Sequence, residues 1–229
     1  ALLIEGTGVG DATDTGNVGV SIGVSNVMST GGDITIKGQG GVGNSGNMGV
    51  VIADRKVEST TGNIVIEGTG GEGDNSDGVR IQNATVRTKD GGMINIKGTA
   101  LGAVSPSGTM VDSGFSEITT FVALPDASNG VSMDSSQIDS HGNLTVSGDG
   151  DNDVGVAMSG TTMISETGRI QLDGKSESHG AVHVGDVTAS TIELVSRGGD
   201  VTIESTGGID AGALVLRDES TSGADYMLD

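Results

Sequence analysis

The sequence predicts an all-β solenoid, a parallel β-helix with about 30 residues per coil and Gly/Asp-rich corners. A five-residue phrase (apolar, any, apolar, usually charged, usually Gly) occurs seven times, and its first residues lie 32, 30, 30, 50, 26 and 31 positions apart. Alternation with period 2 indicates strands with one buried face. A period near 30 indicates units that bury this face on their neighbours. The 42 glycines disfavour helices.

The seven phrases supply one strand of each coil. They are Leu2–Gly6, Ile34–Gly38, Ile64–Gly68, Ile94–Gly98, Leu144–Gly148, Ile170–Gly174 and Val201–Ser205. If equivalent strands lie side by side, Ile34, Ile64 and Ile94 point inward and stack on one another. The central outward residues would then form one row: Thr35, Val65, Asn95, Thr145, Gln171 and Thr202. That row is too mixed in chemistry for an ice-binding plane.

The same register places charges of alternating sign next to one another on the outside. Lys37, Glu67 and Lys97 follow the inward residues in three consecutive phrases. Opposite charges on adjacent strands are favourable, although each surface pair contributes only about 0–1 kcal/mol. The charges therefore support the register more than they stabilise the fold.

Each unit contains two further strands. The second follows a glycine, in the segments Val20–Ile22, Val50–Ile52, Val79–Ile81, Val131–Met133 and Val156–Met158. The third is centred near Val27, Val57, Val86, Ile138 and Ile164, and leads into a turn that ends in glycine. Three strands separated by Gly, Asn and Asp corners describe a coil with a triangular section. From about Ser190 the strand segments lie closer together in the sequence.

One unit is about 20 residues longer than the others, and we treat residues 1–229 as one repeat domain with an insertion at 101–129. The insertion contains Pro106, Pro125, Phe115 and Phe121. Repeat arrays accept insertions at their corners, commonly on a binding face. A flap that covers a sheet and a recognition loop are both open for this segment.

Composition excludes several classes of function. Only 11 Lys and Arg residues against a net charge of −20 exclude nucleic-acid binding, which needs clustered positive charge. The absence of cysteine removes thiolate chemistry and disulfides. No apolar run approaches the roughly 18 residues of a membrane span. The chain opens inside a repeat at Ala1–Ile4, so we expect it to be a piece of a longer protein.

Two glycine-rich phrases resemble a known group of proteins. Gly199–Ile203 and Thr206–Gly212 are similar to the repeats of filamentous haemagglutinin-type and related giant bacterial surface proteins. The resemblance covers essentially the whole chain and implies a right-handed parallel β-helix. It also implies an extracellular or cell-surface adhesin or fibre. These families share no catalytic residues.

The acidic corners are candidate calcium ligands. Asp149, Asp151 and Asp153 alternate with Gly and Asn, a spacing that suits oxygen ligation of Ca²⁺. The phrase resembles the start of an EF-hand loop, but Gly160 stands where its final Glu would be. Solvated acidic turns are the alternative. We expect at most one calcium site, at these three residues, and no required cofactor.

A catalytic function is not expected, although polysaccharide lyases and hydrolases use the same coil. Glycoside hydrolysis needs two carboxyl groups at a defined separation, and almost any acidic β-helix offers such a pair. Sugar-binding grooves also usually carry aromatic platforms, whereas this chain has only Phe115, Phe121 and Tyr226. His179 and His183 lie four apart, but the Gly180 corner separates them, so we expect ordinary surface histidines.

The sequence thus favours a structural and adhesive segment of a bacterial cell-surface or extracellular fibre protein. The alternative is a carbohydrate-active β-helix, including a phage tailspike-type depolymerase. The expected partners are copies of the chain, associated end to end or laterally, or adjoining parts of a longer chain. Host or cell-surface ligands are further candidates, and neither nucleic acid nor a membrane span is expected.

Overall fold

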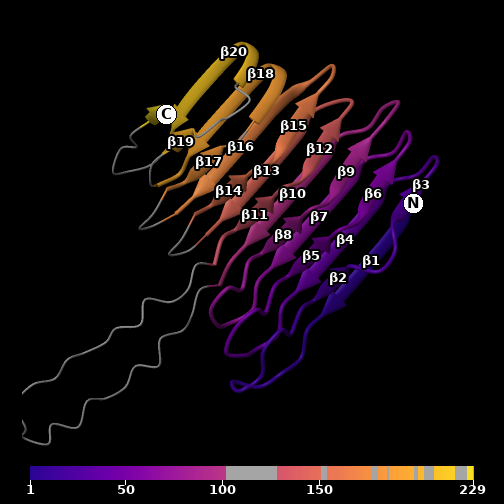
Figure 1. Ribbon diagram of the computed structural model, residues 1–229, viewed down its shortest axis with the longest axis vertical. Coiled ribbons are helices and arrows are strands. Elements are labelled where there is room, and N and C mark those ends of the chain that lie inside the picture. Colours follow the sequence, from indigo (N-terminus) through magenta and orange to yellow (C-terminus); the bar gives the residue numbers. More distant parts are fainter. Residues whose placement is uncertain are drawn as a thin grey trace, which may run out of the picture.

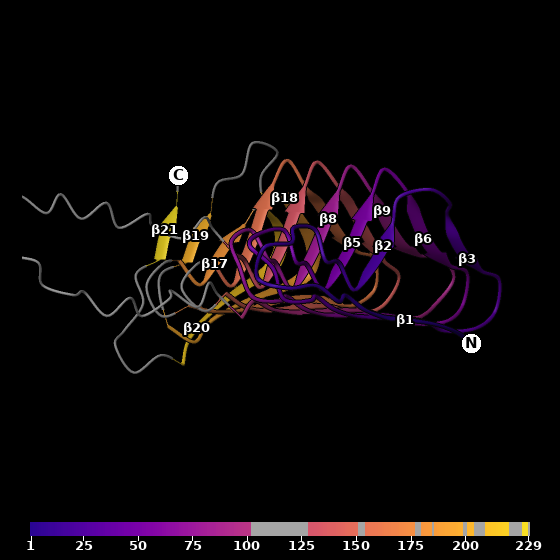
Figure 2. The ribbon, with the colours of Figure 1, turned by 90° about the horizontal axis from the view of Figure 1, so that it is seen from below.

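The computed structural model describes residues 1–101, 128–150, 154–176, 180–184, 186–198, 201–203, 209–219 and 226–228. None of these residues is helical, and the described strands pair in parallel. The predicted insertion lies outside the described residues from 102 to 127. Successive strands lie side by side along the molecule, with the two termini at opposite ends (Figures 1 and 2). The fold is therefore an all-β, solenoid-like stack.

The first ladder contains the strands of the recurring phrase. It runs through β1 (Leu2–Thr7), β4 (Ile34–Gln39), β7 (Ile64–Thr69), β10 (Ile94–Thr99), β13 (Leu144–Asp149), β16 (Arg169–Lys175), β18 (Asp186–Ser196) and β20 (Ile209–Asp218). The predicted register is confirmed, because Ile34 pairs with Ile64 and Ile64 pairs with Ile94. The predicted charge row is confirmed as well, since Glu67 lies between Lys37 and Lys97.

The second ladder forms a separate sheet of eight strands. Its strands are β2 (Val20–Ile22), β5 (Val50–Ala53), β8 (Val79–Gln82), β11 (Val131–Asp134), β14 (Val156–Ser159), β17 (Val182–Val184), β19 (Val201–Ile203) and β21 (Tyr226–Leu228). All five predicted second strands lie in this ladder and in the expected register.

The third ladder joins the first in one sheet of thirteen strands. It contains β3 (Val27–Ser29), β6 (Lys56–Ser59), β9 (Thr85–Thr88), β12 (Gln137–Ser140) and β15 (Thr162–Ser165). Its next member is the first part of β18, whose second part pairs with β16 of the first ladder. β18 thus passes through the corner as one strand and joins the first and third ladders in one sheet.

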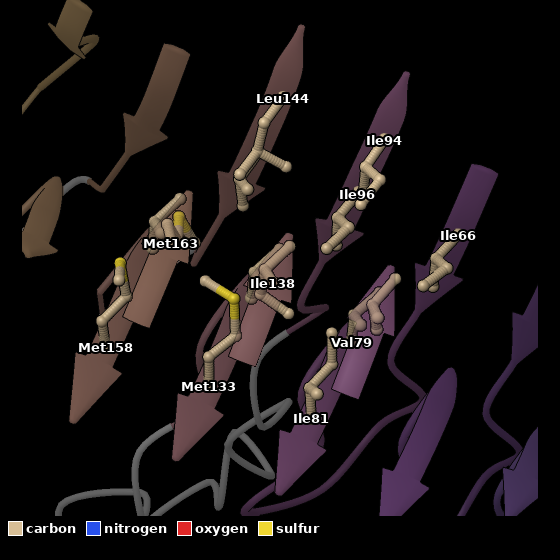
Figure 3. Close-up of a cluster of buried hydrophobic side chains, with 14 of the residues drawn as sticks. Ile66, Val79, Ile81, Ile94, Ile96, Met133, Ile138, Leu144, Met158 and Met163 are labelled. Carbon is tan, nitrogen blue, oxygen red and sulfur yellow. The ribbon is translucent and has the colours of Figure 1, made fainter. Parts of the chain in front are cut away.

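The core consists of columns of aliphatic side chains, one inward residue above the next. Ile34, Ile64 and Ile94 are 0%, 0% and 1% exposed, so the predicted inward stacking is confirmed. Side chains from all three ladders meet in the interior (Figure 3), among them Ile96, Ile81 and Ile138. Because each layer packs on the next, the apolar burial that stabilises the fold extends along the stack.

Two sequence assignments were wrong. Val201–Ile203 lies in the second ladder as β19, paired with β17, whereas the first ladder continues with Ile192 to Leu194. The outward row therefore continues from Gln171 to Glu193 and not to Thr202. The error arose because β18 crosses its corner without a turn and shortens the repeat.

The second error concerns the third ladder. Met163 pairs with Ile138 and is fully buried, while the predicted Ile164 is half-exposed on the outside. Two consecutive apolar residues fit either face, and a slip of one residue reverses every side chain of a strand.

Polar side chains repeat at the corners and hydrogen-bond the backbone of the next repeat. In one column, Asn17 N donates to Asn47 Oδ1 (3.1 Å), Asn47 N to Ser76 Oγ (3.1 Å), and Ser76 N to Ser128 Oγ (3.0 Å). Asn47 and Ser76 are fully buried. These side chains satisfy backbone donors that the turns leave unpaired, and an unpaired buried donor costs about 1–3 kcal/mol.

The recurrent glycine of the phrase is required by a close approach between ladders. A Cβ added at Gly38 would overlap the carbonyl oxygen of Gly49, and Gly68 stands in the same relation to Gly78. Glycine lets the first and second ladders meet at this corner. No helix within the described residues is long and apolar enough to cross a membrane.

Candidate functional site

The predicted calcium ligands are only partly described. Asp149 is the last residue of β13, and its Oδ2 lies 2.9 Å from Lys175 Nζ on the neighbouring strand. Asp151 and Asp153 lie outside the described residues. Within the described part of the chain, no three His, Asp or Glu side chains form a group that could hold a metal. The lysine would compete with a cation for Asp149, and the calcium site stays a prediction.

The structure describes two of the three histidines, His141 and His183. His183 lies in β17 and pairs with Ala157 and Thr202 on either side. His179 lies outside the described residues, so the expectation of ordinary surface histidines stays a prediction for it. The third histidine, His141, takes part in a different arrangement.

A charged surface that the sequence did not reveal covers the outside of the third ladder. Register places Glu58 beside Arg87 and Arg87 beside Asp139. One residue beyond the pair Ser140 and Ser165, His141 and Glu166 contact each other. We call this surface the third-ladder face, and it comprises Glu58, Arg87, Lys89, Asp139, His141 and Glu166.

Like Glu58, Asp139 has only 13% of its side chain exposed. Its Oδ2 accepts a hydrogen bond from Gln137 Nε2 at 2.7 Å and lies 4.0 Å from Arg87 Nε, while its buried Oδ1 has no hydrogen-bond partner. Burial raises the pKa of Asp139 above its ordinary value, and the nearby Glu166 carboxylate adds to this. Arg87 and Gln137 act in the opposite direction and do not cancel the effect of burial on the pKa.

The other charged groups of the face are paired. His141 Nδ1 lies 2.9 Å from Glu166 Oε2, and both side chains are more than a third exposed. Lys89 Nζ lies 2.6 Å from Glu58 Oε1. The face thus presents three carboxyl groups in different environments. Asp139 is largely buried and has a raised pKa, Glu58 is equally buried and paired with Lys89, and Glu166 is exposed and paired with His141.

A shallow polar hollow of about 480 Å³ lies at the start of the same strands. It is lined by amide, hydroxyl and small side chains from three successive repeats: Asn83, Ala84, Thr85, Ser135, Ser136, Gln137 and Thr162. Asn83 and Ser135 have positive φ angles of 47° and 48°. The left-handed conformation turns the chain sharply between the second and third ladders and opens this hollow.

A separate ionic network crosses the last repeats of the first ladder. Arg197 binds Asp173 through two bonds, Nε to Oδ1 at 2.8 Å and Nη2 to Oδ2 at 3.0 Å, and its Nη1 lies 2.8 Å from Glu219. Arg217 lies 2.7 Å from Glu193 and 3.5 Å from Glu219. These opposite charges lie across three neighbouring strands, so we interpret the network as holding the last strands of the first ladder together.

Comparisons with protein-family models, with curated proteins and with solved structures each returned no significant match. The function must therefore be argued from the strands and side chains described above. Asp139 and Glu166 lie 27 positions apart in the sequence, and only the pairing of β12 with β15 brings them to one surface.

Proposed function

We propose that this chain is a right-handed parallel β-helix with about 30 residues per coil that serves as a rod-like, adhesive segment of a bacterial cell-surface or extracellular fibre protein. No reaction is assigned to it. The observation that carries the proposal is the continuity of the stack. The aliphatic columns run from β4 to β18 without an interruption in the described residues, and buried amide and hydroxyl groups tie the corners together.

Such a stack suits a mechanical role. From β4 to β18 each strand pairs with a parallel neighbour on both sides and packs on an apolar layer, so local opening must break contacts with two neighbouring repeats. A protease needs a locally unfolded segment of chain. Continuous ladders therefore favour a stiff and slowly digested rod.

The lateral surfaces supply the adhesive part of the proposal. The third-ladder face and the adjoining hollow combine hydroxyls, amides and paired charges on a rigid support. Groups of this kind bind a polar ligand such as a surface glycan by hydrogen bonds. Rigid strands hold them in place without the entropic cost of ordering a loop.

Two measurements test the two parts of the proposal. Limited proteolysis should digest the folded chain far more slowly than the urea-unfolded chain. Beads coated with the chain should bind glycan arrays or host cells, and Thr85→Arg with Gln137→Arg in the hollow should abolish this binding. Thr145→Arg, on the outside of the first ladder, is the matched control. Digestion as rapid as that of the unfolded chain would refute the structural part, and beads that bind no surface would refute the adhesive part.

A carbohydrate-active function is the second candidate, and the environment of Asp139 favours it. Glycosidases use one protonated and one ionised carboxyl group, and environment sets which is which. Asp139 has a raised pKa and shares its face with the exposed Glu166. Release of oligosaccharides from a polysaccharide panel by the wild type, lost in Asp139→Asn, would establish this function. The adhesive proposal expects no release.

Calcium binding at Asp149, Asp151 and Asp153 belongs to the same proposal as one optional site. A ligand that binds only the native state must raise the melting temperature. Melting with Ca²⁺ and with EDTA therefore decides the matter, and an unchanged melting temperature removes the site. Asp151→Asn should abolish any calcium effect, while Asp11→Asn, in another acidic corner, should not.

A further inference from the structure

Two consecutive cations adjoin the polar hollow on its β6 side. The outward residue Lys56 of β6 pairs in register with Thr85, which lines the hollow and pairs in turn with Gln137. The same register places Arg55 beside Ala84, and Thr85 N donates to the carbonyl of Arg55 (3.0 Å). Because Ala84 is small, it leaves room next to the arginine.

Neither cation has a carboxylate partner within the described residues. Arg55 Nη1 donates to the backbone carbonyl of Asp54 (2.7 Å), and its buried Nε has no hydrogen-bond partner there. Lys56 is exposed and forms no ion pair with the described part of the chain. By contrast, Arg87 and Lys89 on the next strand each lie within 4.0 Å of a carboxylate. Since 31 acidic residues face only 11 Lys and Arg in this chain, two neighbouring cations without an acid are a local excess of positive charge.

The local charge balance is opposite in sign to that of the whole chain. Residues 54–59 and 83–89, which contain β6 and β9, hold four cations and two carboxylates, a net charge of +2 against −20 for the chain. One of these two carboxylates, Glu58, is paired with Lys89 at 2.6 Å. This end of the hollow therefore attracts an anionic group that most of the surface repels.

We infer that the hollow binds a glycan that carries a carboxylate, such as a chain of uronic acid units, with this carboxylate at Arg55 and Lys56. The inference rests on the proposed adhesive function and names the class of its ligand. A guanidinium offers a planar carboxylate two parallel N–H donors, and the ammonium of the lysine adds a point charge. The side chains of Asn83, Thr85 and Thr162 have no hydrogen-bond partner within the described residues, so they are free to bind the hydroxyl groups of the sugars.

The far side of the hollow has the opposite charge. The row of outward residues that begins with Lys56 continues through Thr85, Gln137 and Thr162 to Asp186. Four strand spacings separate the first and last of these residues, which places them about 19 Å apart. A carboxylate at the Asp186 end would meet a like charge, so the row orients an acidic ligand with its carboxylate towards β6.

The test compares the binding of oligogalacturonate and of its methyl ester by isothermal titration calorimetry. The ester has the same sugar units without the charge, and it should bind about tenfold or more weakly than the acid. Arg55→Gln with Lys56→Gln should remove this difference by weakening the binding of the acid alone. Lys37→Gln with Lys97→Gln removes two cations from the outside of the first ladder, and this matched control should leave both affinities unchanged.

Circular dichroism shows whether each variant is folded, and Lys56→Gln alone, at an exposed site, should still weaken the binding of the acid severalfold. Equal affinity for acid and ester would overturn the inference, and so would binding of the acid that neither substitution weakens. Polyglutamate offers carboxylates without sugar hydroxyls, and binding as tight as that of oligogalacturonate would overturn the assignment to a glycan. If the chain binds neutral glycans as tightly as acidic ones, the adhesive function stands and only this inference fails. If it binds no glycan and no cell surface, both fail.

Discussion

The corner between the third and the first ladder has a different structure in the middle repeats and in the last two repeats. In the middle, a hydroxyl residue ends each third-ladder strand and binds the turn that follows. Gly32 N donates to Ser29 Oγ and Gly62 N to Ser59 Oγ, both at 3.0 Å. Gly168 N donates to Ser165 Oγ at 3.2 Å. Four to six positions then separate the hydroxyl residue from the first inward residue of the next strand.

In β18 and β20 that position is alanine, and the turn is gone. Ala189 pairs with Ala211, and only three positions separate each from Ile192 and Leu214. Without a turn there is no glycine N–H to bind, so a hydroxyl has no role there. The comparison teaches that a hydroxyl residue ends the third-ladder strand only where a turn follows that strand. We call these hydroxyl residues the hydroxyl column.

The largest expected effect separates the middle of the core from its last described first-ladder strand, β20. Ile64→Asp buries a charge in a column that is fully enclosed, and it should destabilise the protein by about 4 kcal/mol or more. Leu214→Asp changes the same column where the side chain is 40% exposed, and we expect a cost of about 1 kcal/mol. Urea unfolding of both variants measures the difference. Equal costs would show that Leu214 is as enclosed as Ile64.

The hydroxyl column provides the next test. Ser59→Ala removes the acceptor of Gly62 N–H from a fully buried site, so it should cost about 1–2 kcal/mol. Ser190→Ala lies in the fused corner of β18 and removes an exposed hydroxyl that donates to Gly168 O, so it should cost less than about 0.5 kcal/mol. Chemical denaturation measures both. The corner comparison fails if Ser190→Ala proves the costlier variant.

A stabilising change is predicted at a turn residue that lacks the side-chain acceptor found at the same position of the neighbouring repeats. This position directly precedes each first-ladder strand. Asn63 N donates to Asp33 Oδ1, Met93 N to Asn63 Oδ1, and Arg169 N to Asn143 Oδ1. Met93 is the residue of this row between Asn63 and Asn143, it has no side-chain oxygen to accept a hydrogen bond, and it is 48% exposed. Met93→Asn would supply an acceptor for Asn143 N–H, with an expected gain of about 0.5–1 kcal/mol. Met93→Leu, which supplies no acceptor, is the control and should bring no gain in a urea titration.

The smallest expected effect depends on pH. The native pKa of Asp139 is raised by burial, so the unfolded chain releases this proton at lower pH than the folded one. The resulting penalty is absent below about pH 4, grows as the pH rises from the unfolded pKa to the native pKa, and is complete above the native pKa. Asp139→Asn should therefore melt about 1–2 °C higher than the wild type at pH 7 and should lose this advantage near pH 3.5.

Asp210 provides the comparison at the end of the stack. It lies on the exposed outside of β20, and Asp210→Asn should leave the melting temperature unchanged at both pH values. A melting difference for Asp139→Asn that is independent of pH would exclude its carboxyl titration as the cause.

The sequence predicted the parts of the fold that repeat with little change. Ile34, Ile64 and Ile94 could be aligned because the phrase around them recurs at a constant spacing with the same alternation. The assignment of Ile164 was wrong, since Met163 and Ile164 fit either face equally well. Val201 was placed in the wrong ladder because the loss of a corner turn changes the spacing without any mark in the phrase itself.

The candidate site was harder to predict than the fold. Asp139, His141 and Glu166 belong to no motif, and their proximity depends on a register that pairs residues 25 positions apart. A correct alignment of the third ladder would have placed them on one surface. The burial of Asp139 and its raised pKa depend on packing that no spacing encodes.

The most direct test of the parallel register is disulfide formation in this cysteine-free chain. Thr35 and Val65 are direct partners on the outer face of adjacent strands, so Thr35→Cys with Val65→Cys places two thiols within the reach of a disulfide. Thr35→Cys with Glu67→Cys shifts one thiol by two residues and out of reach. The account predicts rapid intrachain oxidation of the first pair and little of the second, measured by mass spectrometry of proteolytic fragments. Equal oxidation of both pairs, or faster oxidation of the second, would contradict it.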